Sequence, residues 1–447
     1  MAEPRHRIGE HRAGRDSQRG WGSSDERPQR ITRLQLIDEG FRSLPERYVG
    51  GRSDLDATYH IKLCDLGHTW EVRCTRHGAR VRKGVTRRKP DVTLTTGSET
   101  WLRLRRGQLS GIEALQERLL GVRGNLDLAV AFEGMFRPPG GRPPALQIHD
   151  VPVGRHRIST LTMGSGPDVL LLHGLGGSRA SFFETAAELS NDYRVHAPDL
   201  PGFGSSCKPA LGSYNARWFA EIMLGLLDEL EIGRAHLVGN SMGGRVAIEV
   251  GLQAPHRVGA LGLLSPAVAW VKRALHPIVR LLRPELGLLP HGFSRSAVAS
   301  QLWSIFYNPD VIDPAVGDLM VDEFRRIYHT PGARYALLAS ARNIYLEAPF
   351  GRGGFYPRLA RLRPPALFIW GSHDRLVPPA FGHHVSRWLP GAEQLTIECC
   401  GHVPQVECPE QTNRLLREFF ARADQSAAAA RAAAKTPPAL RPDVRAA

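Results

Sequence analysis

Two patterns of apolar and polar positions divide the chain, and the first covers residues 31–137. An amphipathic stretch at 31–48 opens this part, and short segments follow in which apolar and polar residues alternate. The predicted strands are 57–65, 68–76 and 90–99, and the predicted helices are 98–109, 110–121 and 125–136. Strands followed by helices favour a small α+β domain.

The second pattern, from residue 151 to 423, alternates apolar runs with amphipathic stretches. The predicted strands are 169–174, 193–200, 235–241, 258–266, 365–374 and 393–402, and the clearest helices are 216–232 and 243–256. Several of the runs are almost continuously apolar, as in strands that are buried on both faces. The order predicts an α/β domain whose doubly wound, mostly parallel sheet has helices on both faces and right-handed crossovers.

A long insertion interrupts this second pattern at about residues 266–363. Connections of about 100 residues are usually structured or functional inserts. Segments 270–282, 298–309 and 317–329 have helical periodicity. We therefore expect a helical cap beside the sheet.

Proline, glycine and polar residues mark the boundaries. The run RPPGGRPP at 137–144 predicts a linker over residues 138–150. Residues 1–30 are polar and Arg-rich, which predicts a disordered tail. Residues 424–447 are Ala-rich and then Pro-rich, which predicts a frayed helix that runs into a second disordered tail.

Composition and charge limit the partners. The 447 residues carry a formal net charge of +14, but the basic residues are spread along the chain and form no nucleic-acid-binding motif. We interpret the charge as an Arg-rich solvated surface, with no nucleic-acid partner and at most peripheral contact with anionic lipid.

Cysteine usage and the N-terminus bear on the compartment. The six cysteines lack metal-ligand spacing, and the first residues contain no apolar core of a signal peptide. No apolar run approaches the roughly 18 residues that span a bilayer. We expect a cytoplasmic protein with no metal and no cofactor.

The strongest chemical signal is Gly239-Asn240-Ser241-Met242-Gly243, which fits G-x-S-x-G between a predicted strand and a predicted helix. The strand has to turn sharply into the helix, and glycines on both sides of the serine remove side chains that would clash. Ser241 is then presented at a helix N-terminus, where the helix dipole favours negative charge. The context favours a catalytic serine over a structural glycine turn.

A serine nucleophile needs a base and a residue that orients the base. Asp374 follows the strand ALFIW, and His402 follows the strand QLTIE. Taken singly, Asp374 also fits a loop cap and His402 a turn. The order Ser, Asp, His, with each residue after a strand, favours a triad in which His402 takes the proton of Ser241 and Asp374 orients the imidazole.

The oxyanion of such a reaction needs two N–H donors. The N–H of Met242 is the first expected donor. The second is expected from His173-Gly174-Leu175-Gly176-Gly177, with Leu175 preferred over Gly176. A dinucleotide-binding loop is a weaker interpretation of these glycines, because G-x-G-x-x-G is absent.

From Val169 to about residue 420 the chain resembles the α/β-hydrolase superfamily. The motifs that carry the resemblance are HGLGG at 173, DLPGFGSS at 199, GNSMGG at 239, GSHD at 371 and GHVPQVE at 401. The Asn-Ser-Met core is similar to C–C bond hydrolases of aromatic ring degradation, which usually carry a G-x-G-P-G-type loop and an aromatic residue after the histidine. Here the loop is GLGGS and Val403 follows His402, and both departures favour a carboxylesterase or lipase-like enzyme. Apart from the triad and the oxyanion loop, the residues expected to contact substrate are Gly174, Gly176, Asn240, Trp303, Phe306 and Val403.

The N-terminal domain resembles the sterol-carrier-protein-2 lipid-binding family. The resemblance rests on the strand containing Trp70, on the Trp101-x-x-Leu104-x-x-Gly107 stretch, and on RGNLDLAVAFEGMF from residue 123. It implies a sheet-and-helix fold around an apolar tunnel, with Trp70, Trp101 and Leu104 as lipid contacts. The alternative is an α+β module that uses the same residues as plain core.

The sequence thus favours a serine hydrolase that cleaves a carboxylic ester of a lipophilic small molecule through an acyl-enzyme, with lipid bound in its N-terminal domain. One alternative is a C–C bond or thioester hydrolase on the same triad. The other is a non-catalytic lipid-binding or lipid-transfer protein.

Overall fold

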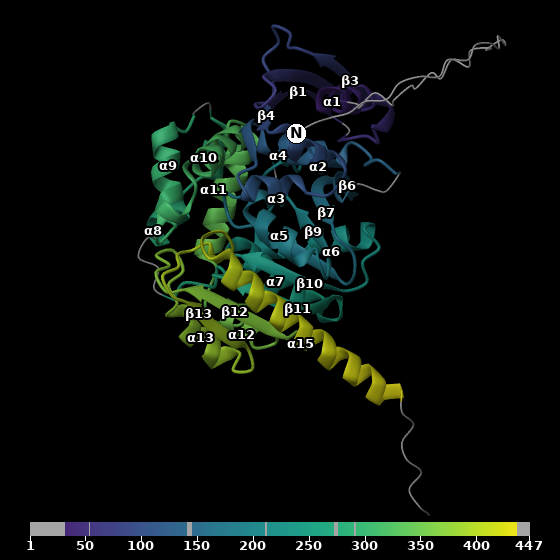
Figure 1. Ribbon diagram of the computed structural model, residues 1–447. Coiled ribbons are helices and arrows are strands. Elements are labelled where there is room, and N and C mark those ends of the chain that lie inside the picture. Colours follow the sequence, from purple (N-terminus) through teal and green to yellow (C-terminus); the bar gives the residue numbers. More distant parts are fainter. Residues whose placement is uncertain are drawn as a thin grey trace, which may run out of the picture.

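The computed structural model describes residues 32–52, 54–140, 145–210, 212–271, 276–289 and 292–435. The predicted N-terminal tail lies outside these residues. Figure 1 shows the N-terminal domain above the large sheet and the cap helices at one side. In the described part of the chain, no helix combines the length and the hydropathy needed to cross a membrane.

The N-terminal domain has a five-stranded sheet in the order β3-β2-β1-β4-β5. Its strands are β1 (Asp56–Leu63), β2 (His68–Thr75), β3 (Gly78–Lys83), β4 (Val92–Thr96) and β5 (Leu120–Gly124), and its helices are α1 (Arg33–Arg42), α2 (Ser98–Arg105), α3 (Gly111–Gln116) and α4 (Leu126–Gly134). Capping boxes start α1 at Thr32 and α3 at Ser110. The predicted helix over 110–121 was too long, because α3 ends at Gln116 and the chain then enters strand β5.

The second sheet has eight strands in the order β13-β12-β11-β10-β8-β9-β7-β6. They are β6 (Leu146–Val153), β7 (His156–Met163), β8 (Asp168–Leu172), β9 (Arg194–Pro198), β10 (Ala235–Asn240), β11 (Val258–Leu264), β12 (Ala366–Gly371) and β13 (Glu393–Ile397). From β9 to β13 the neighbours are parallel, and β6 and β7 form an antiparallel edge. The predicted strands are present, but the edge pair was not predicted, and β6 begins inside the predicted linker.

Helices cover both faces of this sheet. They are α5 (Phe183–Leu189), α6 (Ala216–Glu229), α7 (Met242–Gln253), α12 (Phe355–Leu359), α13 (Phe381–Trp388), α14 (Pro404–Glu407) and α15 (Pro409–Lys435). Alternate residues of β10 point to opposite sides, so Leu237 packs with the α6 and α7 core and Val238 packs with the α5 and α15 core. The second of these cores also contains Ile112 and Leu126 of the N-terminal domain, so the two domains share packed side chains.

The frayed helix predicted at the start of residues 424–447 is a continuation of helix α15. Helix α15 continues to Lys435, and residues 436–447 lie outside the described chain. The run SAAAARAAAK explains the extension, because alanine has the highest helix propensity.

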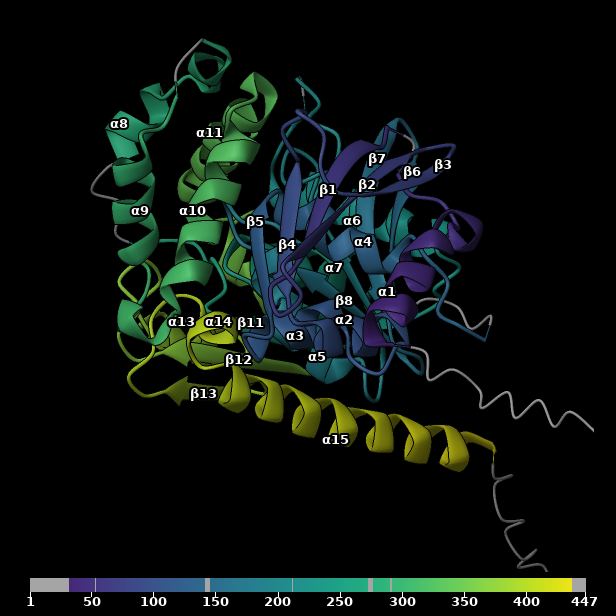
Figure 2. The ribbon, with the colours of Figure 1, turned by 45° about the horizontal axis from the view of Figure 1, so that its top comes forward.

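The insertion forms the expected helical cap. Its helices are α8 (His276–Leu281), α9 (Arg295–Trp303), α10 (Pro314–Tyr328) and α11 (Pro331–Leu346). The first three match the predicted helical segments, and α11 was not predicted. Figure 2 shows α10 beside β5 of the N-terminal domain, and the two elements are in contact, so the cap borders that domain.

Candidate active site

Ser241, the predicted nucleophile, occupies a strained turn between β10 and α7. Its backbone has φ 51° and ψ −114°, in the left-handed half of conformational space that costs free energy for a residue with a Cβ. A Cβ at Gly243 would overlap the carbonyl of Leu172, and a Cβ at Gly239 would overlap the backbone of Gly243. The two glycines are therefore required by space, as G-x-S-x-G predicts.

Backbone hydrogen bonds hold this turn in place. The N–H of Ser241 donates to the carbonyl of Leu264 at 2.9 Å. The carbonyl of Ser241 accepts from the N–H of Arg245 at 3.0 Å and from the N–H of Ala267 at 2.9 Å. The strained conformation is thus fixed from the neighbouring strand and from the helix.

Asp374 and His402 form the expected pair. The Asp374 Oδ2 lies 2.7 Å from the His402 Nδ1, and both side chains are buried. The other oxygen, Oδ1, accepts from the N–H groups of Leu376 at 2.8 Å and Val377 at 2.9 Å. With both oxygens engaged, the carboxylate is oriented to accept the Nδ1 proton, which leaves Nε2 unprotonated in the neutral ring.

Asn240 links this pair to the serine turn. Its Nδ2 donates to the backbone carbonyl of His402 at 3.0 Å and to that of Leu264 at 3.1 Å. The sequence motif had suggested that Asn240 contacts substrate. Because both amide hydrogens bond backbone carbonyls, we propose instead that Asn240 positions the His402 loop against the residue next to Ser241.

A buried glutamate that the sequence analysis missed joins the His402 loop to the cap. The Glu407 Oε2 accepts from the N–H of Gly401 at 2.7 Å, and Oε1 accepts from the N–H groups of Tyr307 at 2.8 Å and Asn308 at 2.7 Å. The N–H of His402 also donates to the carbonyl of Ile305 at 2.8 Å. No local sequence signal marks Glu407, because its two partners in the cap lie about 100 residues away along the chain.

The loop after β8 is ordered by a buried histidine. His173 Nδ1 donates to the carbonyl of Gly174 at 2.8 Å, and Nε2 accepts from the N–H of Leu200 at 2.9 Å. Burial lowers the pKa of His173, so the ring is neutral and its tautomer is set. Gly176 has φ 81°, and a Cβ there would lie 3.4 Å from the Phe324 ring of the cap. The turn and the close approach explain the glycines of this loop.

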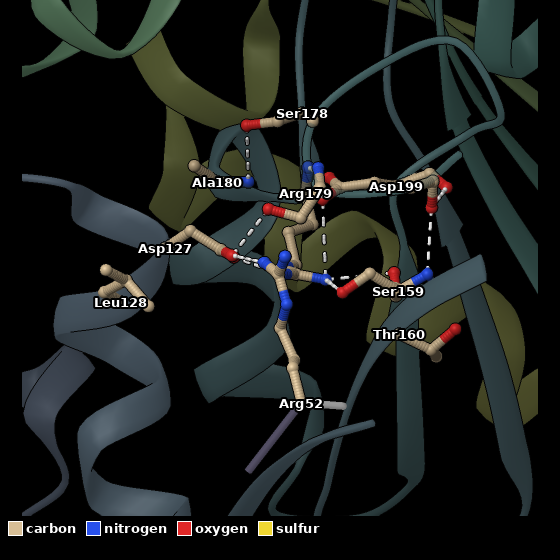
Figure 3. A network of polar contacts seen from close by, with 12 residues as sticks. Arg52, Asp127, Leu128, Ser159, Thr160, Ser178, Arg179, Ala180 and Asp199 are labelled. Carbon is tan, nitrogen blue, oxygen red and sulfur yellow. Dashed lines mark hydrogen bonds and ion pairs between the residues drawn. The ribbon is translucent and has the colours of Figure 1, made fainter. Parts of the chain in front are cut away.

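The same loop is tied to the N-terminal domain by a buried ion pair. Figure 3 shows Arg179 between Asp127 of α4 and the residues Ser159 and Asp199 of the large sheet. The backbone N–H of Arg179 donates to Asp199 Oδ1 at 2.8 Å. The side-chain Nη1 of Arg179 donates to the Ser159 carbonyl at 2.9 Å. The network therefore fixes the domain junction directly after the predicted oxyanion loop.

Asp127 is the residue that the N-terminal domain contributes to the Arg179 network. Besides Arg179 it contacts Arg52 Nη1 at 3.0 Å, and it accepts from the Ser205 hydroxyl at 2.6 Å. Burial raises the pKa of Asp127, but the two guanidinium groups outweigh burial and hold the pKa well below its ordinary range. Asp127 is therefore charged at neutral pH.

The remaining predicted contacts are Trp303, Phe306 and Val403. Trp303 packs on Phe306, with ring centroids 5.8 Å apart, and against Gly317 within the cap. Val403 is buried at the start of α14. The structure gives these residues packing partners, and their contact with substrate stays a prediction.

In the N-terminal domain, the predicted lipid contacts divide into two groups. Trp70 stacks on Phe41 at 4.4 Å and belongs to the packed core. Trp101 and Leu104 line a cavity of about 530 Å³, which also contains Glu133 and Arg105. Trp70 does not line this cavity, so the structure favours Trp101 and Leu104 as the candidate lipid contacts.

Comparison with known sequences identifies both parts of the chain. Residues 169–415 match the model of the Alpha/beta hydrolase family, and residues 47–137 match that of the SCP-2 sterol transfer family. The chain is 30% identical to the dihydrolipoyllysine-residue acetyltransferase component of the acetoin cleaving system of Pseudomonas putida, over 75% of this chain and 84% of that protein. It is 33% identical to a 2-hydroxy-6-oxononadienedioate/2-hydroxy-6-oxononatrienedioate hydrolase of Burkholderia vietnamiensis, over 58% of this chain and 89% of that protein.

Solved structures give the same assignment. A membrane phospholipase A, described as a bacterial virulence factor, matches with a TM-score of 0.53 and 27% identity over 63% of this chain and 87% of that one. The 2-hydroxy-6-oxo-6-phenylhexa-2,4-dienoate hydrolase of Rhodococcus sp. strain RHA1 matches with a TM-score of 0.51 and 26% identity over 62% of this chain and 99% of that one. The chain therefore belongs to the alpha/beta hydrolase family, and it carries an SCP-2 sterol transfer domain on the N-terminal side of the hydrolase.

Proposed function

We propose that the protein is a serine hydrolase that cleaves a carboxylic ester of a lipophilic substrate, with Ser241, His402 and Asp374 as its triad. The observation that carries the proposal is the strained serine at the N-terminus of α7, joined through Asn240 to a histidine whose Nδ1 faces a fully engaged carboxylate. This arrangement supplies a nucleophile, an oriented base and a helix N-terminus that favours a developing anion.

The proposed reaction has two halves. The Ser241 hydroxyl oxygen attacks the ester carbonyl carbon while His402 Nε2 takes its proton, and the carbonyl oxygen becomes an anion that accepts from the N–H groups of Met242 and Leu175. The C–O bond then breaks, and His402 returns the proton to the departing alcohol. In the second half, water attacks the acyl-enzyme, His402 takes a proton from that water, and the carboxylic acid leaves as Ser241 regains its proton.

Two observations support a lipophilic ester as substrate. The SCP-2 segment contains a cavity of about 530 Å³ whose walls include Trp101 and Leu104, and we propose that it holds lipid. The similar phospholipase A belongs to a class of enzymes that cleaves carboxylic esters of lipids. A lipid-binding domain joined to the hydrolase places an apolar ligand in the same molecule as the nucleophile.

A C–C bond hydrolase is the second candidate. Its support is the 33% identity to a ring-fission product hydrolase and the similarity to the Rhodococcus enzyme of the same chemistry. The GLGGS loop and Val403 after His402 are the residues that favour the ester instead. Both reactions use the same triad, so substrate turnover has to separate them.

The test begins with labelling by a fluorophosphonate, which reacts with an activated serine. We expect the full chain to be labelled and Ser241→Ala to lose the label. The control Ser190→Ala, which changes a serine at the C-terminal end of α5, should keep the label. Ser241→Ala should also lower kcat by at least about 10³-fold. Absence of labelling in folded protein contradicts the proposal and favours a non-catalytic lipid-binding protein.

Substrate class is then measured with p-nitrophenyl butyrate, butyrylthiocholine and 2-hydroxy-6-oxo-6-phenylhexa-2,4-dienoate. We expect kcat/KM for the oxygen ester to exceed that for the dienoate by about 10²-fold or more, which corresponds to roughly 3 kcal/mol of transition-state discrimination. The reverse ranking overturns the ester assignment and leaves the C–C hydrolase.

A further inference from the structure

A cavity of about 400 Å³ lies where the N-terminal domain, the hydrolase and the cap meet. Its walls come from α3 and Leu126 of the N-terminal domain, from residues 176–184, which begin at the end of the predicted oxyanion loop, from α10 of the cap, and from residues 405–409 after His402. Its volume is within the usual range of small-molecule sites. Ser241, Asp374 and His402 are not among the lining residues; the links to the proposed catalytic centre are Gly176 of the predicted oxyanion loop and Gln405, three residues after His402.

The wall from the N-terminal domain is a fixed part of this cavity. Ile112 and Leu126 are buried in the same core as Leu319 of α10. Arg118 pairs with Asp313, the residue that caps α10, at 3.1 Å. Together with the buried Arg179–Asp127 pair, these contacts hold α3 against both the hydrolase and the cap.

Most of the lining is aliphatic or aromatic. Leu115 faces the cavity from α3, Met320 and Phe324 face it from α10, and Val406 faces it from the His402 loop. Each methylene group that leaves water for such surroundings strengthens binding by roughly fourfold. An acyl or alkyl chain is the ligand that gains most from this wall.

Four buried polar side chains interrupt the apolar lining, and they differ in their partners: Ser178, Glu323 and Glu407 form hydrogen bonds within the protein, whereas Gln405 forms none. Gln405 lies three residues after His402, is 1% exposed and lines the cavity. Its Nε2 and Oε1 are both buried and have no hydrogen-bond partner in the described part of the chain. Burying an amide without partners is unfavourable, and a carbonyl or hydroxyl group of a ligand would satisfy it.

We infer that the junction cavity is a binding site for the hydrocarbon chain of an ester or fatty acid, that Gln405 binds a polar group of the ligand, and that α3 of the SCP-2 domain forms one wall. For its catalytic consequence this inference rests on the proposed function, since the chain would belong to the substrate cleaved at Ser241. The SCP-2 domain then sets chain-length preference directly, as part of the hydrolase pocket.

Photo-crosslinking locates the site without using catalysis. The full chain carrying Ser241→Ala is irradiated with a palmitic acid that bears a diazirine on its chain, and the adducts are mapped by mass spectrometry. We expect adducts on α3, on α10 and on residues 405–409, in addition to any adducts in the cavity beside Trp101. Adducts confined to the Trp101 cavity overturn the inference.

A matched pair of variants tests whether filling the cavity blocks ligand binding. Leu115→Trp projects a large side chain from α3 into the cavity, and Leu119→Trp places the same residue at an exposed position outside it. We expect Leu115→Trp to abolish the α10 adducts, and to lower kcat/KM for p-nitrophenyl dodecanoate at least tenfold relative to p-nitrophenyl butyrate. Leu119→Trp should change neither. Met320→Trp fills the cavity from the cap side, and the same two measurements are made on this variant if Leu115→Trp does not fold.

Gln405→Leu tests the polar group at nearly constant volume. Because an unpaired amide is removed, Tm should rise, while KM for the dodecanoate ester should rise about tenfold with kcat unchanged. A purely structural glutamine would not raise stability and weaken substrate binding together, so a lower Tm contradicts this role.

The outcomes separate the two proposals. If Ser241 reacts with fluorophosphonate but Leu115→Trp leaves the chain-length profile unchanged, the cavity inference fails and the serine hydrolase stands. If the α10 adducts form but Ser241 is never labelled, the binding site stands and the hydrolase proposal fails.

Discussion

The side-chain amide of Asn240 donates a hydrogen bond to the backbone carbonyl of His402 at 3.0 Å. Asn240 precedes Ser241 in the chain, whereas His402 lies beyond the cap and two further strands. One buried hydrogen bond therefore sets the position of the proposed base relative to the proposed nucleophile. The same amide also bonds Leu264 at the end of the neighbouring strand, so three segments converge on one side chain.

This relationship predicts the effect of Asn240→Ala. The substitution leaves the carbonyl of His402 without its donor, which costs about 1–3 kcal/mol of stability, and it frees the His402 loop to shift. Since a 1 Å displacement of a catalytic group costs about 10²-fold in rate, kcat should fall by about that factor with KM little changed. Steady-state ester hydrolysis and urea unfolding measure both effects. The control is Asn343→Ala, which removes an exposed amide that bonds the Ser213 carbonyl; an equal loss of kcat in that variant refutes the positioning role.

A second prediction concerns Asp374→Asn. The Leu376 and Val377 N–H groups would hold the amide oxygen, so the amide nitrogen would face His402 Nδ1. Nδ1 then has to accept, Nε2 carries the proton, and the ring is unable to take the proton of Ser241. We expect kcat to fall by about 10³–10⁴-fold with the fold retained. Activity within tenfold of the parent would show that Asp374 is not the acid of the triad.

The sequence was sufficient for the parts of the fold and site that depend on local pattern. Buried parallel strands are continuous apolar runs, so β8, β10, β11 and β12 were evident, and the serine turn carries its own glycine signature. Asp374 lies three residues after the buried strand β12, whereas His402 lies five residues after β13, a mostly exposed edge strand that was predicted from the segment QLTIE.

The missed elements lack that local pattern. β3 is a short edge strand with mostly charged exposed residues, and β5 begins where a helical sequence ends and contains two glycines. The helix of the C-terminal alanine run was underestimated because its low complexity was weighted above its helix propensity.

The polar contacts that organise the site were not predictable from the sequence, for another reason. Asp127 occupies the first turn of α4, where an acidic residue is ordinary, and Gln405 follows the proline that begins the short helix α14. Their importance depends on residues brought near by the tertiary fold: Arg179, which is 52 positions from Asp127, and the cavity walls around Gln405. Periodicity contains no information about such pairs.

A third prediction follows from the buried Asp127–Arg179 pair. Asp127→Ala removes one of the two carboxylates that pair with the buried Arg179 and also takes a partner from Arg52, so the free energy of unfolding should fall by about 3–5 kcal/mol. The double variant Asp127→Ala with Arg179→Met should recover little of that loss, because it leaves the buried Asp199 carboxylate without its guanidinium partner. Urea unfolding of the full chain measures both. Asp54→Ala removes an exposed partner of Arg52 and should cost under about 1 kcal/mol; a loss as large in this control as in Asp127→Ala contradicts the special role of the junction.

The last prediction uses the pH dependence of Glu133, which lines the cavity beside Trp101. Burial raises the pKa of Glu133 to about 7, and the Glu113 carboxylate adds to the rise, while the Gly111 N–H and Arg105 oppose it. In the unfolded chain the group titrates near its ordinary value of about 4.3. Between these two values the folded protein binds more protons than the unfolded chain, so the stabilisation is complete below about pH 4 and is lost as pH rises through about 7.

Glu133→Gln removes this dependence while it keeps an oxygen that accepts from the Gly111 N–H. At about 1.4 kcal/mol per pKa unit, the variant should gain up to roughly 3 kcal/mol over the parent at pH 8 and under about 1 kcal/mol at pH 5. Urea unfolding of the full chain at the two pH values measures the difference, with the exposed Glu117→Gln as control. An equal gain at both pH values would mean that Glu133 is ionised throughout, because only a group that titrates between them makes the gain depend on pH.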